Sequence, residues 1–186
     1  MSIRHFPSQG YVRMSWKNGR GSTDEICLMP PGASRDAFDL RISRASIPEP
    51  GPFSAFPGVE RTITVIDGAG LKLDFGDQVA TLTARQPYTF DSGLAPLGIP
   101  KGGPVRVVNV MAARAVWRIA PAAVVTETAS LDAVLSVVFA IDGNWLLDDG
   151  PNRTTLVRGD TALSEGPGSL APQSAGAVLV VPLIPA

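Results

Sequence analysis

The 186-residue sequence contains one cysteine, Cys27, and one histidine, His5. A single cysteine cannot form an internal disulfide or a Cys-x-x-Cys redox pair, and it excludes a zinc finger built on several cysteines. A single histidine likewise excludes a metal site made of several histidines. We therefore expect no bound metal and no other cofactor. Cys27 lies in an apolar stretch, so we interpret it as a small buried hydrophobic residue rather than as a nucleophile.

Charged residues are also scarce, at 18% of the chain against a usual ~25%. The net charge of −1 gives no reason to expect nucleic acid or an anionic membrane as a partner. No stretch approaches the ~20 consecutive apolar residues of a membrane span, and the first ten residues contain no signal-peptide core. We therefore expect a cytoplasmic protein.

The few charges are unevenly distributed along the chain. Residues 1–118 hold 14 Lys and Arg against 10 acidic residues, whereas residues 119–186 hold 2 against 7. This pattern predicts an anion site in the first part of the chain, or an attraction between the two parts.

Glycine and proline, in contrast, are abundant, with 19 and 17 residues. Between their clusters, residues 61–67 and 79–84 alternate apolar with polar side chains, and residues 134–141 and 177–184 form short apolar runs rich in β-branched residues. Short strands closed by turn residues predict an all-β protein, built as an antiparallel sandwich or barrel.

Two segments of the chain resemble each other. When residues 64–93 are aligned with residues 138–166, Ile66-Asp67-Gly68 meets Ile141-Asp142-Gly143. A spacing of about 75 residues is too long for a solenoid repeat and is typical of a duplicated β-barrel, although two similar hairpins would give the same pattern.

The segment SWKNGRGSTDEI, residues 15–26, is unusually polar for a stretch that leads into an apolar strand. A turn at its Asn-Gly pair explains those two residues alone. It does not explain Trp16 and Lys17 before the turn, or Thr23 and Glu25 after it, which share one strand face. We interpret the segment as a loop and strand that contact a ligand.

A second such stretch covers residues 38–61. Arg41 and Ser43 share one strand face there, and the loop GPFSAFPG at residues 51–58 leads to Arg61. The two phenylalanines of this loop can wall an apolar pocket, to which a serine or an arginine adds polarity. The alternative is a packed loop that closes one end of a barrel.

These motifs occur together in the order seen in the HutD/Ves family, which the chain resembles over residues 11–118. The resemblance rests on Trp16-Lys17-Asn18-Gly19 with Thr23-x-Glu25-Ile26, Phe38-Asp39-x-Arg41-Ile42-Ser43, the stretch from Gly51 to Arg61, and Asn109-Val110-Met111. The chain departs from the family pattern at Arg20 and Leu40, where the family commonly has Gly and Trp.

The resemblance implies a bicupin, in which one chain forms two small antiparallel jelly-roll, cupin-like barrels. We accordingly expect an N-terminal tail at residues 1–12, a first barrel at residues 13–120 and a second barrel at residues 121–186, with strands exchanged between them in one compact unit. Many family members are encoded beside histidine-utilisation genes and are thought to moderate that pathway by binding one of its metabolites, whereas members of the Ves type lie elsewhere.

We therefore expect a metal-free protein that binds a small carboxylate metabolite and acts as a sensor or moderator of metabolism. Its cations are Lys17, Arg41 and Arg61, of which only the arginines can grip a carboxylate bidentately. The expected ligand-binding residues are Trp16, Lys17, Asn18, Thr23, Glu25, Arg41, Ser43, Phe53, Phe56, Arg61, Asn109 and Met111.

Two alternatives belong to other classes of protein. A metal-independent isomerase or hydrolase would use Glu25 and Lys17 as catalytic groups, which requires both to face one cavity. A structural or protein-interaction module would use the acidic C-terminal part to contact another protein or to form a homodimer. We expect Glu25 to pair with a cation and favour binding over catalysis.

Overall fold

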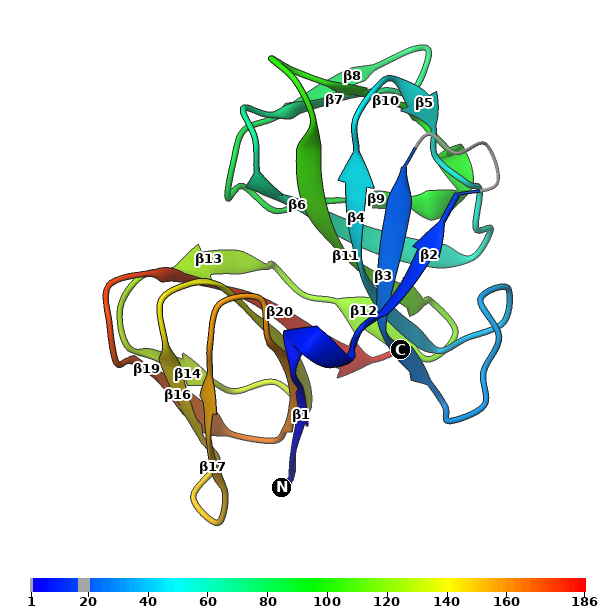
Figure 1. Cartoon of the computed structure of the whole chain (residues 1–186). Helices are drawn as coiled ribbons and strands as arrows, with labels where there is room; N and C mark the ends of the chain where they lie inside the picture. The colour runs from blue at the N-terminus through cyan, green and yellow to red at the C-terminus, as the bar shows by residue number, and fades with distance from the viewer. Residues whose placement is uncertain (1, 17–20) are drawn as a thin grey trace. The chain divides into compact units, whose positions relative to one another are not determined.

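The computed structural model describes residues 2–16 and 21–186 (Figure 1). These residues form strands and two short 3₁₀ helices, η1 (Ser8–Gly10) and η2 (Ser92–Leu94), so the expected all-β class is confirmed. Within the described ranges, no helix is long and apolar enough to cross a membrane. The chain divides into two compact units, residues 12–117 and residues 1–11 with 118–186.

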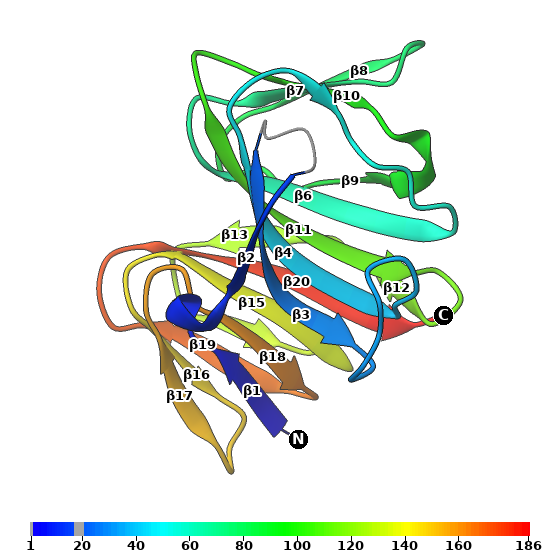
Figure 2. The same ribbon diagram turned by 45° about the vertical axis from the view of Figure 1, so that its right-hand side comes forward.

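The unit of residues 12–117 contains two antiparallel sheets. The larger sheet follows the order β2 (Val12–Ser15), β3 (Ser22–Met29), β4 (Leu40–Ile47), β11 (Val105–Ala113), β6 (Val59–Asp67) and β9 (Tyr88–Asp91). The smaller sheet follows the order β5 (Gly51–Pro52), β10 (Leu97–Pro100), β7 (Leu71–Asp74) and β8 (Val79–Leu82). Figure 2 shows β3, β4, β11 and β6 side by side.

The core of this unit follows from the alternation seen in the sequence. Leu71 and Leu73 of β7 pack with Ile63 and Val65 of β6 and with Val107 of β11, all fully buried. Because successive strand residues point to opposite faces, the same period also sends polar residues of β4, β6 and β11 to the inner face. The inner face of the larger sheet therefore carries polar side chains beside the apolar core.

The second unit also contains two antiparallel sheets. One contains β1 (Ser2–Phe6), β18 (Thr161–Glu165), β15 (Leu135–Asp142), β20 (Ala177–Pro185) and β12 (Trp117–Ile119) in this order, with β13 (Ala123–Val125) paired to β20. The other follows the order β14 (Ala129–Leu131), β19 (Gly168–Pro172), β16 (Trp145–Asp148) and β17 (Arg153–Leu156). In neither unit does the strand pairing of the described residues close into a ring.

The segment expected as an N-terminal tail contains strand β1, which pairs along its whole length with β18. His5 Nε2 lies 2.9 Å from Asp160 Oδ2, and the Tyr11 hydroxyl donates to the Gly159 carbonyl at 2.7 Å. The N-terminal segment is therefore held by the same unit as the C-terminal part of the chain.

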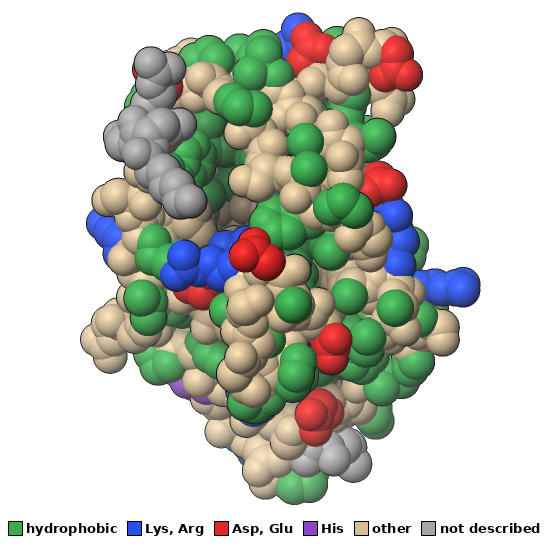
Figure 3. All heavy atoms as spheres, turned by 90° about the vertical axis from the view of Figure 1, so that its right-hand side faces the viewer, with side chains coloured by type: hydrophobic (Ala, Val, Ile, Leu, Met, Phe, Trp, Pro, Cys, Tyr) green, Lys and Arg blue, Asp and Glu red, His purple; other side chains and the backbone are tan. Residues whose placement is uncertain are grey.

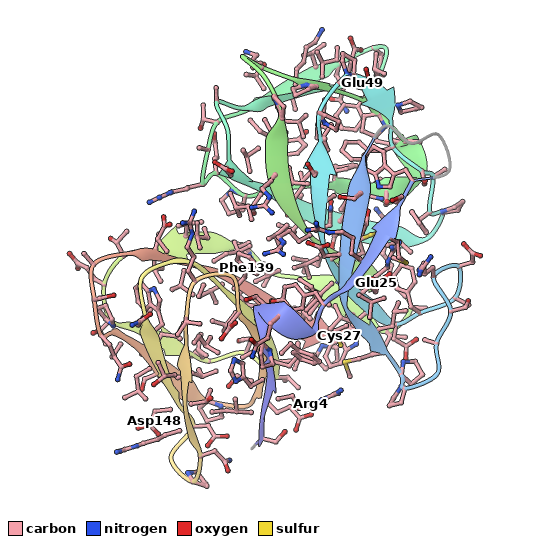
Figure 4. All side chains as sticks on the ribbon, in the orientation of Figure 1. Arg4, Glu25, Cys27, Glu49, Phe139 and Asp148 are labelled. Carbon is pink, nitrogen blue, oxygen red and sulfur yellow. The ribbon has the colours of Figure 1, made fainter. Side chains whose placement is uncertain are left out.

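The two similar segments form strands with the same pairing. Leu71 of β7 faces Leu82 of β8, and Trp145 of β16 faces Leu156 of β17. The turns also match, because an aspartate Oδ1 accepts from the backbone N–H two residues later in both, in one case from Asp148 at 2.8 Å (Figure 4). The sequence similarity therefore reflects a repeated strand arrangement.

Candidate functional site

A cavity of about 560 Å³ lies within the unit of residues 12–117. It is lined by Met14, Ser15, Trp16, Thr23, Arg35, Asp36, Arg41, Ser43, Ala45, Pro52, Phe53, Ser54, Phe56, Arg61, Asn109 and Met111. The surface view shows basic and acidic side chains next to each other beside a hollow lined by hydrophobic side chains (Figure 3). Of these lining residues, those on strands form one wall of the cavity, and those in the loops at residues 30–39 and 53–58 form the others.

The strand register brings the polar lining residues into two rows on the inner face of the larger sheet. Met111 of β11 faces Arg41 of β4 on one side and Arg61 of β6 on the other. One step along the same face, Asn109 lies opposite Ser43. Two arginines thus flank a thioether, and an amide lies beside a hydroxyl.

Arg61 is the most deeply buried of these cations, with 4% of its surface exposed. Its Nε donates to Ser92 Oγ at 3.0 Å, and its Cζ lies 5.2–5.7 Å from the ring centres of Phe53, Phe56 and Phe90. Burial, and after it the positive charge of Arg41, lower the pKa of Arg61 to about 10, so it stays protonated at neutral pH. Among the residues that the structure describes, no carboxylate pairs with Arg61.

Arg41 differs from Arg61 because it has a carboxylate partner. Its Nε and Nη2 donate to the two oxygens of Glu25 at 3.0 and 3.1 Å, a bidentate pair that is largely buried. Glu25, on β3 (Figure 4), also receives Arg35 Nε at 3.3 Å. Arg35 in turn contacts the Met14 sulfur. Arg41 is therefore paired with a carboxylate within the protein, as we expected of Glu25 and one of the cations.

Asn109 supplies the cavity with a side-chain amide whose oxygen has no hydrogen-bond partner in the described structure. Its Oδ1 is buried without a hydrogen bond in the described structure, and the residue is 5% exposed. Ser43, its neighbour across the sheet, is 3% exposed. A buried amide oxygen without a partner is costly, so a hydrogen bond from a ligand would stabilise it.

The edge of the cavity is formed by Trp16, whose Nε1 donates to Thr23 Oγ1 at 2.9 Å. Gly21 permits this arrangement, since a Cβ there would lie 2.7 Å from the Trp16 ring and 2.8 Å from the Ser46 carbonyl oxygen. The polar segment recognised in the sequence thus contributes an indole ring to the cavity wall, with its polar atom already bonded.

Nine of the twelve expected ligand residues line this one cavity. They are Trp16, Thr23, Arg41, Ser43, Phe53, Phe56, Arg61, Asn109 and Met111. Glu25 contacts the lining arginines instead, and Lys17 and Asn18 lie outside the described residues. Their role in binding a ligand stays a prediction.

Sequence reasoning missed Arg35 and Asp36, because the loop at residues 30–39 has no periodic pattern that could place them. It also missed Ser92, the hydrogen-bond acceptor of Arg61, which lies 31 residues away in the chain. Ser92 lies in a segment without any of the family motifs, so nothing in the sequence marked it as a partner of Arg61.

Glu25 does not have the arrangement that a general base needs, because both of its oxygens accept from guanidinium groups. The cavity lining contains no lysine among the described residues. No group of three or more His, Cys, Asp or Glu side chains in residues 2–16 and 21–186 is placed to hold a metal ion. The side chains that line the cavity can bind an anion through arginine and hydroxyl donors, and Asn109 Oδ1 can accept a hydrogen bond from another group of the ligand.

The model of the HutD family matches residues 8–180 of the chain. The chain belongs to the HutD family. Protein Ves from Citrobacter koseri is 37% identical to this HutD-family chain over 136 residues, which cover 72% of the chain and 70% of that protein.

The solved structures of two similar proteins match this chain over nearly its whole length. A conserved protein of unknown function from Pseudomonas aeruginosa PAO1 has 29% identity and a TM-score of 0.88, with 99% of this chain and 100% of that chain covered. HutD from Pseudomonas fluorescens SBW25, studied in a formate condition, has 28% identity and a TM-score of 0.81 with complete coverage of both chains.

More distant structures show the fold alone. A bacterial pirin from Escherichia coli, solved in complex with nickel(II), has 11% identity and a TM-score of 0.66 and covers 99% of both chains. The HutD-family chain therefore has a cupin-like all-β fold. The nickel is a property of that pirin and assigns no metal to this chain.

Proposed function

We propose that the cavity binds a small carboxylate metabolite and that Arg61 is the cation that receives the carboxylate. The observation that carries this proposal is a buried guanidinium that lines a cavity and has no carboxylate partner among the described residues. Burying an uncompensated charge is costly, and an anion that enters the cavity offsets that cost. Arg41 differs because it already donates to a carboxylate, that of Glu25, through its Nε and Nη2.

The rest of the cavity supports a small organic anion rather than an inorganic one alone. Phe53, Phe56 and Met111 provide apolar walls, and the unpaired Oδ1 of Asn109 provides a hydrogen-bond acceptor. A pocket with mostly apolar walls and a few placed polar groups is typical of metabolite sites.

The family name suggests the pathway. The matched family and the similar structure from Pseudomonas fluorescens carry the name HutD, which associates this chain with histidine utilisation. The function we propose is that of a metal-free sensor or moderator that responds to a metabolite of this pathway. In this proposal the two units are the two cupin-like jelly rolls of a bicupin. A cytoplasmic location and a homodimer stay predictions.

A thermal-shift screen tests the proposal. We expect at least one of urocanate, histidine, formiminoglutamate, formylglutamate and formate to raise the Tm, because a ligand that binds only the folded state stabilises it. At a hundred times its Kd such a ligand adds about 2.7 kcal/mol, which corresponds to roughly 5–10 °C for a chain of this size. If none of the five raises the Tm, the histidine-pathway assignment is wrong.

A further inference from the structure

The hydrogen bond to Ser92 takes the Nε donor of the Arg61 guanidinium group. The group has five N–H donors, one on Nε and two on each Nη. Nε donates to Ser92 Oγ at 3.0 Å, and Nη2 approaches the Ser54 carbonyl oxygen at 3.5 Å. Three N–H donors remain, two on Nη1 and one on Nη2. Because Ser92 takes the N–H of Nε, the pair of parallel N–H groups left for a ligand is the one that Nη1 and Nη2 form at the end of the group.

Ser92 holds both this guanidinium and one of the rings beside it. It is 1% exposed, and while its hydroxyl accepts from Arg61, its backbone carbonyl accepts from Phe56 N at 3.0 Å. Ser92 belongs to η2, whose start is fixed by Asp91 Oδ1 accepting from Gly93 N at 2.8 Å. The direction of the Nη1 and Nη2 pair is therefore set by Ser92.

Aromatic rings restrict the space around the guanidinium. The Cζ atom of Arg61 lies 5.2 Å from the ring centre of Phe53 and 5.7 Å from those of Phe56 and Phe90. Phe53 itself is held close to the backbone at Gly98, where an added Cβ would lie 3.1 Å from the ring. Ligand oxygens that enter this space without meeting an N–H donor would therefore lose water against apolar carbon.

The shape of an anion then decides how well it fits. A carboxylate is planar and can place both oxygens in the guanidinium plane, opposite two parallel N–H groups. A sulfonate, phosphonate or phosphate group is tetrahedral, so at least one of its oxygens lies outside this plane.

We propose that Arg61 binds a planar carboxylate end-on through Nη1 and Nη2, that the site rejects tetrahedral oxyanions, and that Ser92 is the positioning residue for this selectivity. The inference rests on the proposed function, since it describes how the same cavity recognises its ligand.

Titration of the full chain with benzoate and benzenesulfonate tests the inference, because the two anions share a ring and a charge of −1 and differ in the shape of the anionic group. We expect wild-type protein to bind benzoate at least about tenfold more tightly. Ser92→Ala should weaken benzoate binding by about five- to tenfold, while the ratio of the two affinities falls toward one. Ser92→Thr, which keeps the hydroxyl, should retain the ratio, and Ser130→Ala in the other unit should change nothing.

Two results would overturn the inference and leave the proposed function intact. One is equal affinity of wild-type protein for both anions. The other is a Ser92→Ala variant that weakens both affinities by the same factor, because a merely structural role would do this. If folded wild-type protein binds neither anion, the inference is overturned, and the proposed function fails with it only if none of the five metabolites raises the Tm either.

Discussion

Arg61 combines three properties that are rarely found together in one side chain. It is buried, it is charged at neutral pH, and it has no carboxylate partner in the part of the chain that the structure describes. The rings of Phe53, Phe56 and Phe90 and the hydroxyl of Ser92 reduce the cost of burying the charge without neutralising it. Binding of an anion should therefore be coupled directly to the charge of Arg61.

The pKa of Arg61 predicts the pH dependence of binding. Because burial and Arg41 lower this pKa to about 10, Arg61 begins to lose its proton above about pH 9. An anion binds the protonated form, so the affinity for benzoate should be constant from about pH 6 to 9 and fall about tenfold per pH unit well above 10. Titration calorimetry across this range, with circular dichroism to confirm the fold, measures it. A tenfold loss between pH 6 and 8 would show that another group carries the binding.

At the scale of single residues, the sequence predicts which side chains line the cavity, but it does not predict which arginine lacks a carboxylate partner. Arg41 and Arg61 both belong to family motifs and both lie on inner strand faces. Their difference depends on Glu25 of β3, which pairs with Arg41 of the neighbouring strand β4, and the register of these two strands shifts between Glu25 and Cys27. Register between strands far apart in sequence cannot be read from alternation, because alternation fixes only the face of a residue.

Strands β2, β3 and β4 are joined on their other face by an ionic cluster. Asp24, 6% exposed, accepts from Arg13 at 2.8 Å and from Arg44 at 2.8 Å, and these residues face each other in the strand register. Burial alone would raise the pKa of Asp24, but the hydrogen bonds and charges of Arg13 and Arg44 outweigh burial and lower it. The cluster fixes β3, which carries Thr23 and Glu25 on its inner face.

Asp24→Asn should lower the free energy of unfolding at pH 7 by about 3 kcal/mol, because it removes the charge that two arginines share. Since the folded-state pKa is depressed, this stabilisation is present above the unfolded-state value of about 4 and is lost as the pH falls through the folded-state value. Urea unfolding at pH 7 and at pH 2.5 should show the difference between the two proteins shrinking in acid. The exposed Asp77→Asn is the control and should have an effect within about 0.5 kcal/mol.

At the scale of elements, local patterns predict strands well and loops poorly. The alternating stretch at residues 61–67 lies within β6, and the one at residues 79–84 begins as β8. The expectation that Arg41 and Ser43 share a face is confirmed, because both line the cavity while Arg44 bonds Asp24 on the other face. The loop that carries Arg35 could not be placed, since it has no periodicity.

Across the whole molecule, the strand arrangement is repeated but the site is not. Asp67 and Asp142 are 75 residues apart, and the same spacing, continued back along the strands, places Arg61 of β6 on Ser136 of β15. Arg61 faces Phe90 across its sheet, and Ser136 faces Ser164, both of which are buried. Of these two equivalent positions, only that in β6 holds a cation, which agrees with the excess of basic residues before position 118.

The N-terminal strand should stabilise the unit that contains the C-terminal part of the chain. Deletion of residues 2–6 removes five register pairs with β18 and the contact between His5 and Asp160. We expect the Tm to fall by at least about 5 °C, measured by differential scanning calorimetry. Arg4→Ser, at an exposed position of the same strand, is the control and should leave the Tm nearly unchanged. An unchanged Tm after the deletion would show that β1 contributes little.

The central claim is that one buried arginine receives a carboxylate ligand, and the most direct test is calorimetric titration of wild-type protein and Arg61→Met with the same carboxylate at pH 7. Arg106→Met, which removes an exposed arginine of β11 outside the cavity, is the matched control. We predict a loss of affinity of about a hundredfold for Arg61→Met and no change for Arg106→Met. Equal affinity of wild-type protein and folded Arg61→Met would contradict the claim.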